Sequence, residues 1–139
     1  RFGVGIVNCQ WFETGAYAAY RHLLDEDIDL VMHLGDYIYE YAGNERVRKY
    51  ATREIRSLDD YRIRSAQTKA DPALKAAHAA APWIVTWDDH EVDNNYAGLI
   101  GENGMESDEQ MRLRRAAAYS ISETAIGGGR GVDIAPGGR

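Results

Sequence analysis

Residues 33–40 read HLGDYIYE, and they follow directly on the apolar run from Ile28 to Met32. An apolar run that stops at a Gly-Asp pair predicts a buried strand whose carboxyl end delivers a carboxylate, here that of Asp36. In open α/β sheets ligands bind at that edge, because the loops leaving the strands line a crevice there. The stretch therefore predicts an α/β fold with Asp36 in its binding site.

Two other apolar runs end in the same manner. Residues 2–7 lead into NCQ at 8–10, and residues 83–87 lead into DDHE at 88–91. Each predicted strand is thus followed at once by side chains that can hold a metal ion. One such ending alone would be a weak signal, and it is their repetition that predicts a site.

Composition narrows the class of protein. The chain has 139 residues, which suits one domain, and it is 45% hydrophobic and 27% charged, as in soluble globular proteins. Its formal charge of -6 argues against a nucleic-acid-binding surface and suits a cation site. The single cysteine, Cys9, excludes an intramolecular disulfide. We find no signal-peptide-like segment and no long apolar span, so we expect this chain to contain neither a targeting signal nor a membrane span.

The first part of the chain predicts a βαβ unit. A strand at 2–7 is followed by a helix starting near Thr14-Gly15, and then by a strand at 28–34. This order implies parallel strands and a right-handed crossover. The predicted helix has an apolar face made of Ala16, Ala19, Tyr20, Leu23 and Leu24.

Local signals place the later elements. Residues 41–57 have no clean period and predict an excursion over the site, and residues 58–69 predict a helix. Asp71-Pro72 predicts an N-cap and first turn, and Ser107 opens a capping box before a further helix. The predicted inner faces of these last two helices are Leu74, Ala77, His78 and Ala81 in one, and Met111, Ala118 and Tyr119 in the other.

We therefore predict an α/β fold of mainly parallel strands with crossover helices. Residues 1–124 are expected to form this domain portion. Residues 125–139 are rich in glycine and lack periodicity, and they are expected to be a flexible tail.

Five side chains are candidate metal ligands. Asp36 and Asp89 offer carboxylates, Asn95 an amide oxygen, Cys9 a thiolate and Tyr39 a phenolate. Hard oxygen donors favour Ca²⁺, Mg²⁺ or Mn²⁺, whereas thiolate and phenolate favour a more acidic transition metal such as ferric iron. A cation beside the thiol and the phenol would hold both deprotonated.

Structural alternatives to these assignments remain open. A lone cysteine such as Cys9 is more often a buried small hydrophobe than a ligand. Tyr37, Tyr39 and Tyr41 alternate, as in a strand with one packed face, and His78 fits a satisfied core histidine. For Asp36 and the acids at 88–89 a structural role is less convincing, because buried acids need partners. The charged residues of the excursion are expected to form a solvated face: Glu45, Arg46, Arg48, Lys49, Arg53, Glu54 and Arg56.

These motifs carry a resemblance to a known family. Cys9-Gln10 after the first strand, HLGDYIYE, and WDDHE at 87–91 followed by Asn94-Asn95 resemble PhoD-type alkaline phosphatases, which belong to the metallophosphoesterases. The resemblance covers residues 2–119. It implies that the domain is part of the four-layer α/β/β/α sandwich of that superfamily.

The resemblance also implies a ligand arrangement. Asp36 is expected to bridge two metal ions, with Asp89 standing where the superfamily has an asparagine ligand. Ferric iron is expected on Cys9 and Tyr39, and calcium on Asp36 and Asp89, although other divalent metals fit as well. Asn95 is added as a further ligand.

The activity implied for the intact protein is hydrolysis of phosphomonoesters and phosphodiesters, with Asp36 and His90 as the catalytic residues. The family resemblance further implies an extracellular or periplasmic, monomeric protein. The superfamily completes its site from a second half of the domain that this chain lacks, so we expect an incomplete fragment. One alternative is a metal- or phosphate-binding fragment without turnover, and another is an unstable half whose motifs are relics.

Overall fold

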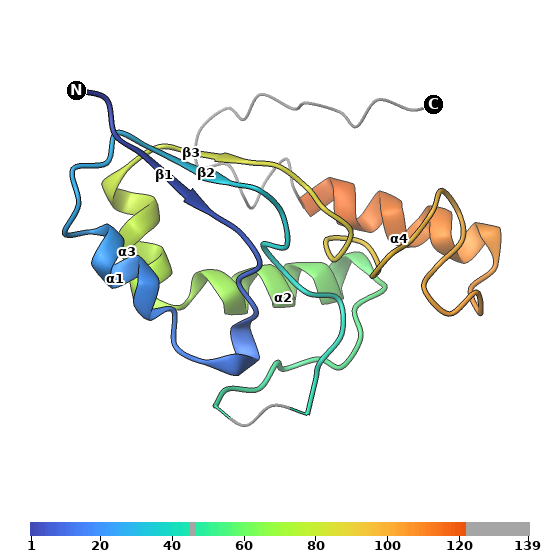
Figure 1. The fold of residues 1–139 in the computed structure, drawn as a ribbon. Coiled ribbons are helices and arrows are strands. Elements are labelled where there is room, and N and C mark those ends of the chain that lie inside the picture. Colours follow the sequence, from blue (N-terminus) through green and yellow to red (C-terminus); the bar gives the residue numbers. More distant parts are fainter. Residues whose placement is uncertain (45–46, 122–139) are drawn as a thin grey trace.

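The computed structural model describes residues 1–44 and 47–121 (Figure 1). The predicted tail at 125–139 and its boundary at 124 lie outside these residues. In chain order the elements are β1 (Val4–Val7), the 3-10 helix η1 (Phe12–Thr14), α1 (Ala18–Leu23), β2 (Leu30–His33), α2 (Leu58–Lys69), α3 (Pro72–Ala80), β3 (Trp83–Val85) and α4 (Asp108–Ile121). The α/β fold class is confirmed. In the described part of the chain, no helix combines the length and apolar character needed to cross a bilayer.

The three strands form one parallel sheet in the order β1-β2-β3, as predicted. Each strand is shorter than the apolar run that predicts it. At the carboxyl ends of the strands, one further main-chain hydrogen bond extends each pairing, from the Leu34 N–H to the Val7 carbonyl at 2.8 Å and from the Thr86 N–H to the His33 carbonyl at 2.9 Å. Beyond these bonds the three segments leave the sheet and continue as loops at its carboxyl edge.

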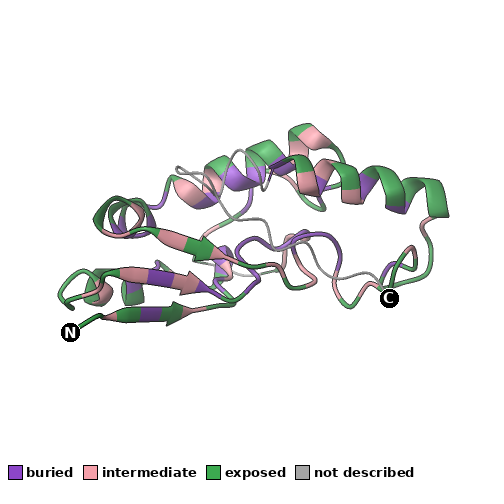
Figure 2. Cartoon of the chain, turned by 90° about the horizontal axis from the view of Figure 1, so that it is seen from above, coloured by how far each residue is buried: buried purple, intermediate pink, exposed green. Residues whose placement is uncertain are grey.

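The two faces of the sheet differ in burial. Helices α1, α2 and α3 lie on one side of it (Figure 1). Val31 and His33, which alternate with Met32 along β2, are fully buried. Ile6, Met32 and Ile84 are register partners across the sheet and therefore share the opposite face. Ile6 is 66% exposed and Ile84 is 49% exposed, so this face is largely uncovered by described residues. Figure 2 shows exposed or intermediate positions on all three strands.

Local capping signals set three of the four α-helices as predicted. Ser57 and Asp60 form a reciprocal capping box at α2, whose bounds are those expected from the sequence. The Asp71 carboxylate accepts from the N–H groups of Ala73 at 2.9 Å and Leu74 at 3.1 Å at the start of α3. Ser107 and Gln110 exchange hydrogen bonds at the start of α4.

The predicted start of the first helix is wrong. The chain instead forms η1, passes through an extended Gly15, and begins α1 at Ala18 without a side-chain cap. Of the predicted apolar face only Tyr20 is buried. Its hydroxyl donates to Gln10 Oε1 at 2.5 Å, and that of Tyr17 donates to the Gln10 carbonyl at 2.8 Å, so a buried polar contact and not an apolar stripe positions the helix.

The excursion at 41–57 contains no helix or strand among its described residues, but it is more than a solvated face. Tyr50 and Ile55 are buried in the core. Arg48, predicted to be solvated, lies 3.8 Å over the Phe12 ring and pairs with Asp71 at 2.5 Å. The other charged residues of the predicted face that the structure describes are exposed, namely Lys49, Arg53, Glu54 and Arg56. Glu45 and Arg46 are outside the described residues.

Candidate metal centre

The loops after the three strands meet at the carboxyl edge of the sheet. The Cys9 N–H donates to the Gly35 carbonyl, and the Gln10 N–H donates to the Asp36 carbonyl, both at 3.1 Å. Gly35 is required there, because its φ is 115° and an added Cβ would lie 2.6 Å from the Asp88 Cβ. Close main-chain approach therefore brings all three predicted strand endings together.

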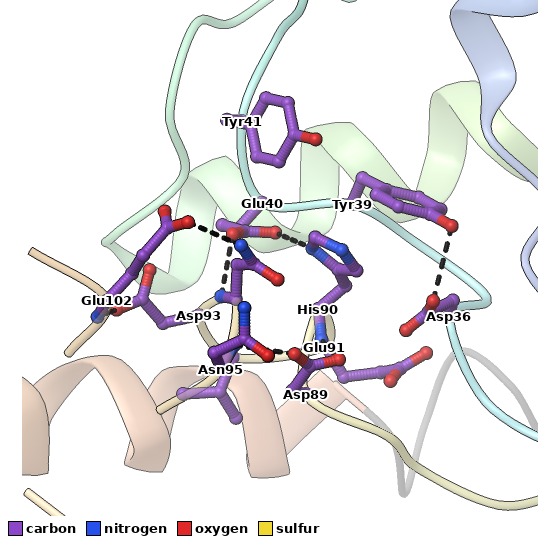
Figure 3. Close-up of polar contacts among 12 residues, drawn as sticks. Asp36, Tyr39, Glu40, Tyr41, Asp89, His90, Glu91, Asp93, Asn95 and Glu102 are labelled. Atoms are coloured by element: carbon purple, nitrogen blue, oxygen red, sulfur yellow. Dashed lines mark hydrogen bonds and ion pairs between the residues drawn. The ribbon is translucent and has the colours of Figure 1, made fainter. Parts of the chain in front are cut away.

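Asp36 lies at the centre of this edge. Its Oδ2 accepts from the Cys9 thiol at 3.4 Å and from the Tyr39 hydroxyl at 3.2 Å (Figure 3). The side chain is only 6% exposed, yet its buried Oδ1 has no hydrogen-bond partner among the described residues. A buried carboxylate oxygen without a donor is costly, and a cation is the natural partner for it.

Asp36 also joins the residues of the third loop. One ligand atom from each of Asp36, Asp89 and His90 lies within 4.8 Å of the others. No other three such donors gather in this way within residues 1–44 and 47–121. The predicted site residues therefore fall into two sets that share Asp36, one with Cys9 and Tyr39 and the other with Asp89 and His90.

Asn95 is placed beside the second set through its main chain. The Asn95 N–H donates to Asp89 Oδ2 at 2.5 Å. Asn95 is exposed and has a φ of 52°. Its role as a ligand stays a prediction.

Two of the structural alternatives are wrong. Cys9 is exposed and not a buried hydrophobe. Tyr37, Tyr39 and Tyr41 are not in a strand, since Asp36 has a φ of 56° and the chain leaves the sheet there. The assignment of His78 as a satisfied core histidine is confirmed, because its Nε2 lies 2.7 Å from the Tyr37 hydroxyl.

The expectation of consecutive buried acids at 88–89 is also wrong. Asp88 is exposed and Asp89 is half-buried. The buried acid of this segment is Glu91, whose carboxylate accepts from the Tyr37 N–H at 2.5 Å and from the Asp88 N–H at 2.9 Å. Burial raises the pKa of Glu91 to about 7, although the two main-chain bonds act in the opposite direction. Glu91 thus ties the loop after β2 to the loop after β3.

Glu40 is a second buried acid that the sequence analysis missed. It is 1% exposed, and its Oε2 lies 2.7 Å from His90 Nδ1 while its Oε1 accepts from the Asn94 N–H at 2.8 Å (Figure 3). The contact places the proton of His90 on Nδ1 and fixes the ring. Burial lowers the pKa of His90, but the Glu40 hydrogen bond and charge outweigh burial and raise the pKa above its ordinary value. Its signal in the sequence was its place at the end of HLGDYIYE.

Without a cation, the surroundings of the thiol and the phenol favour their neutral forms. Although Cys9 is an exposed residue, partial desolvation of its thiol, followed by the hydrogen bond and charge of Asp36, raises its pKa. Burial, followed by the charge of Asp36, raises the pKa of Tyr39. A metal ion would reverse these directions by replacing repulsion between anions with attraction. The donor chemistry and the unpartnered Asp36 Oδ1 both fit such an ion.

Comparison with known proteins identifies the family of this chain. Residues 2–121 match the family model of the PhoD-like phosphatases. The chain is 58% identical over 118 residues to alkaline phosphatase D of Bacillus subtilis (strain 168), covering 81% of this chain and 20% of that protein. A solved structure described as "Structure of PhoD" superposes with a TM-score of 0.79 at 54% identity, covering 84% of this chain and 23% of that one. The chain therefore spans about a fifth of the length of this curated relative, and it belongs to the PhoD-like phosphatase family.

Proposed function

We propose that this chain carries one part of the site of a metal-dependent phosphoric ester hydrolase, which acts on phosphomonoesters and phosphodiesters in a protein of its relatives' length. The observation that supports the proposal most directly is Asp36. It is buried, it is shared by two donor sets, and one of its oxygens has no partner in the described structure. Such a carboxylate suits a position between two cations.

The residues suggest which ions they would hold. Cys9 and Tyr39 with Asp36 would suit ferric iron, whereas Asp36 with Asp89 and Asn95 would suit calcium or another divalent ion. When bound, metals in such sites polarise phosphoryl oxygens and lower the pKa of bound water.

His90 supplies the proton chemistry. Glu40 holds Nδ1, so Nε2 is the ring atom that can face a phosphoryl oxygen or a leaving group. When Nε2 carries a proton, the ring would stabilise negative charge that develops on that oxygen.

The uncovered sheet face supports a finer fold proposal. Ile6, Met32 and Ile84 form an apolar rung on the side opposite the helices, as expected if a second sheet packs there in a four-layer metallophosphoesterase sandwich. Remaining ligands would come from that second layer. The family resemblance also leads us to propose a monomer located outside the cytoplasm.

A chimera tests the proposed activity. Residues 1–121 of this chain would be joined to the part of the Bacillus subtilis relative that follows the aligned segment. Hydrolysis of p-nitrophenyl phosphate and its bis ester would be measured with calcium and ferric iron and after chelation. We expect metal-dependent hydrolysis that Asp36→Asn abolishes, because asparagine keeps the left-handed backbone but not the charge.

The chimera also separates the alternative. A folded chimera that binds calcium and hydrolyses neither ester would favour a metal- or phosphate-binding role without turnover. A thermal melt of the chain alone would show whether it is stable by itself.

A further inference from the structure

The loop that follows Asp36 is held by one buried cation. Arg64 on α2 is fully buried, and its Nη1 donates to the main-chain carbonyls of Tyr39 and Tyr41. The Glu40 carbonyl between them accepts from the Ile55 N–H at 2.7 Å. Three consecutive carbonyls of this loop therefore have partners that come from α2 and from the excursion at 41–57.

The other arm of the same guanidinium holds the excursion. Its Nη2 donates to the Thr52 carbonyl at 2.9 Å, to the Arg53 carbonyl at 2.6 Å and to Thr52 Oγ1 at 3.2 Å. The group also lies 3.6 Å over the centre of the Tyr50 ring. Arg64 thus joins two segments whose described residues form neither helix nor strand.

The cation has no carboxylate partner at ion-pair distance in the described structure. The comparably buried Arg114, in contrast, pairs with Asp93 at 3.2 Å and with Glu106 at 3.1 Å. Burying an unpaired charge is costly, and burial accordingly lowers the pKa of Arg64. An apolar side chain would fill the space at lower cost, so the planar fork of donors has a use beyond packing.

The side chains of the held loop are those of the site. The Tyr39 hydroxyl donates to Asp36 Oδ2 at 3.2 Å, and the Glu40 carboxylate lies 2.7 Å from His90 Nδ1. Main-chain displacement at 39–41 would move both contacts together.

We propose that Arg64 is a positioning residue, whose guanidinium fixes the main chain at 39–41 and thereby sets the Tyr39 phenol against Asp36 and the Glu40 carboxylate against His90. The importance of these two contacts rests on the proposed function, whereas the contacts themselves do not.

The test reads the proton on His90 in this chain without metal. Imidazole ¹⁵N spectra would be recorded at about pH 9, where the ring is neutral, and His90→Asn would assign its signals. The wild type should favour the Nδ1–H tautomer, because Glu40 accepts from Nδ1. Arg64→Lys keeps the charge and loses the fork, and we expect the ratio of Nδ1–H to Nε2–H to fall by roughly two- to tenfold, as for the loss of one hydrogen bond.

Arg48→Lys is the matched control. Arg48 is a partly buried arginine whose bonds go to Phe12 and Asp71 and not to residues 39–41, so the tautomer ratio should keep its wild-type value. A folded Arg64→Lys variant with an unchanged ratio would overturn the proposal. If Arg64→Lys does not fold, Thr52→Val takes its place, because it removes only the Oγ1 acceptor of Arg64 Nη2. A fall in the tautomer ratio smaller than that expected for Arg64→Lys supports the proposal. An unchanged tautomer ratio in Thr52→Val overturns it. None of these outcomes depends on hydrolysis, so failure of the chimera would not be confused with them.

Discussion

Asp36 is shared by two donor sets, and different kinds of contact hold the other residues of each set in place. On one side, Cys9 and Tyr39 are positioned by the main chain and by aromatic packing. Cys9 has a left-handed backbone, and the Tyr39 ring stacks on Trp11 with centroids 5.4 Å apart and lies 4.2 Å from the His90 ring. Neither the left-handed backbone of Cys9 nor the stacking of Tyr39 on Trp11 depends on a charged partner.

On the other side, Asp89 and His90 are positioned by buried carboxylates. Glu40 holds His90 and the Asn94 N–H, and Glu91 joins the two loops through main-chain N–H groups. The positions of Cys9 and Tyr39 therefore depend on backbone conformation and ring packing. The positions of Asp89 and His90 depend instead on the protonation state of Glu40 and Glu91. Substitutions and pH should therefore affect the two sets separately, except at Asp36, which belongs to both, and at Arg64, which holds the main chain between Tyr39 and Tyr41.

The largest effect is expected for Asp36→Asn. Asp36 contacts both sets, so its loss should reduce calcium affinity by more than the roughly 10- to 100-fold typical of an outer-shell partner. Calorimetric titration of the folded variant measures this, with Asp88→Asn, an exposed neighbouring acid, as the control. Equal calcium affinity in the wild type and in Asp36→Asn would show that the two sets do not share Asp36 as a ligand.

A pH dependence of the unfolding free energy is expected from Glu91, one of the carboxylates that position Asp89 and His90. The pKa of Glu91, raised by burial from 4.5 to about 7, means that the folded protein binds this proton more tightly than the unfolded chain. The resulting stability is full below about pH 4.5 and is lost as the pH rises through about 7. Relative to Glu91→Gln, the wild type should lose about 3 kcal/mol of unfolding free energy across this window. Urea melts at several pH values measure it, and parallel curves for the two proteins would contradict it.

A smaller effect is expected for Tyr39→Phe, which keeps the stacked ring and removes the oxygen. The affinity for ferric iron should fall by at least about tenfold, the lower end of the effect of losing an outer-shell partner. The melting midpoint should change little, because the ring still stacks on Trp11. Iron content after dialysis and the absorption spectrum of the chimera measure this. Full iron retention with an unchanged spectrum would place the metal away from Tyr39.

The smallest effect on stability is expected for Cys9→Ser. Because Cys9 is exposed, the unfolding free energy should change by no more than about 0.5 kcal/mol. Any thiolate-to-iron absorption band of the chimera should nevertheless disappear, since serine is a harder and far less acidic donor. A large loss of stability with an intact band would mean that Cys9 packs and does not ligate.

Features set by short-range sequence signals could be predicted. The bounds of α2 follow from Ser57 and Asp60, and the start of α3 follows from Asp71 before Pro72. The parallel sheet and the meeting of the strand ends also follow, because apolar runs and their endings are visible in the sequence.

Features that depend on distant partners could not be predicted. Glu40 and His90 are 50 residues apart in the chain, and Glu91 and Tyr37 are 54 apart. The residues next to either acid in the sequence therefore do not indicate its partner. The same holds for Arg64, an arginine inside a helix that would ordinarily be solvated. The start of α1 was missed because its position depends on the buried Gln10 and not on a cap.

The left-handed backbone at three of the five predicted ligands limits how this centre could be redesigned. Cys9, Asp36 and Asn95 have φ values of 52°, 56° and 52°. At such angles glycine, asparagine and aspartate are tolerated at low cost, whereas β-branched residues are strained. Few residue types could therefore replace these ligands in an attempt to change the metal preference. Threonine or valine at these positions would strain the loop backbone. Variation at Tyr39, Asp89 and His90, which have ordinary backbone angles, offers a wider choice.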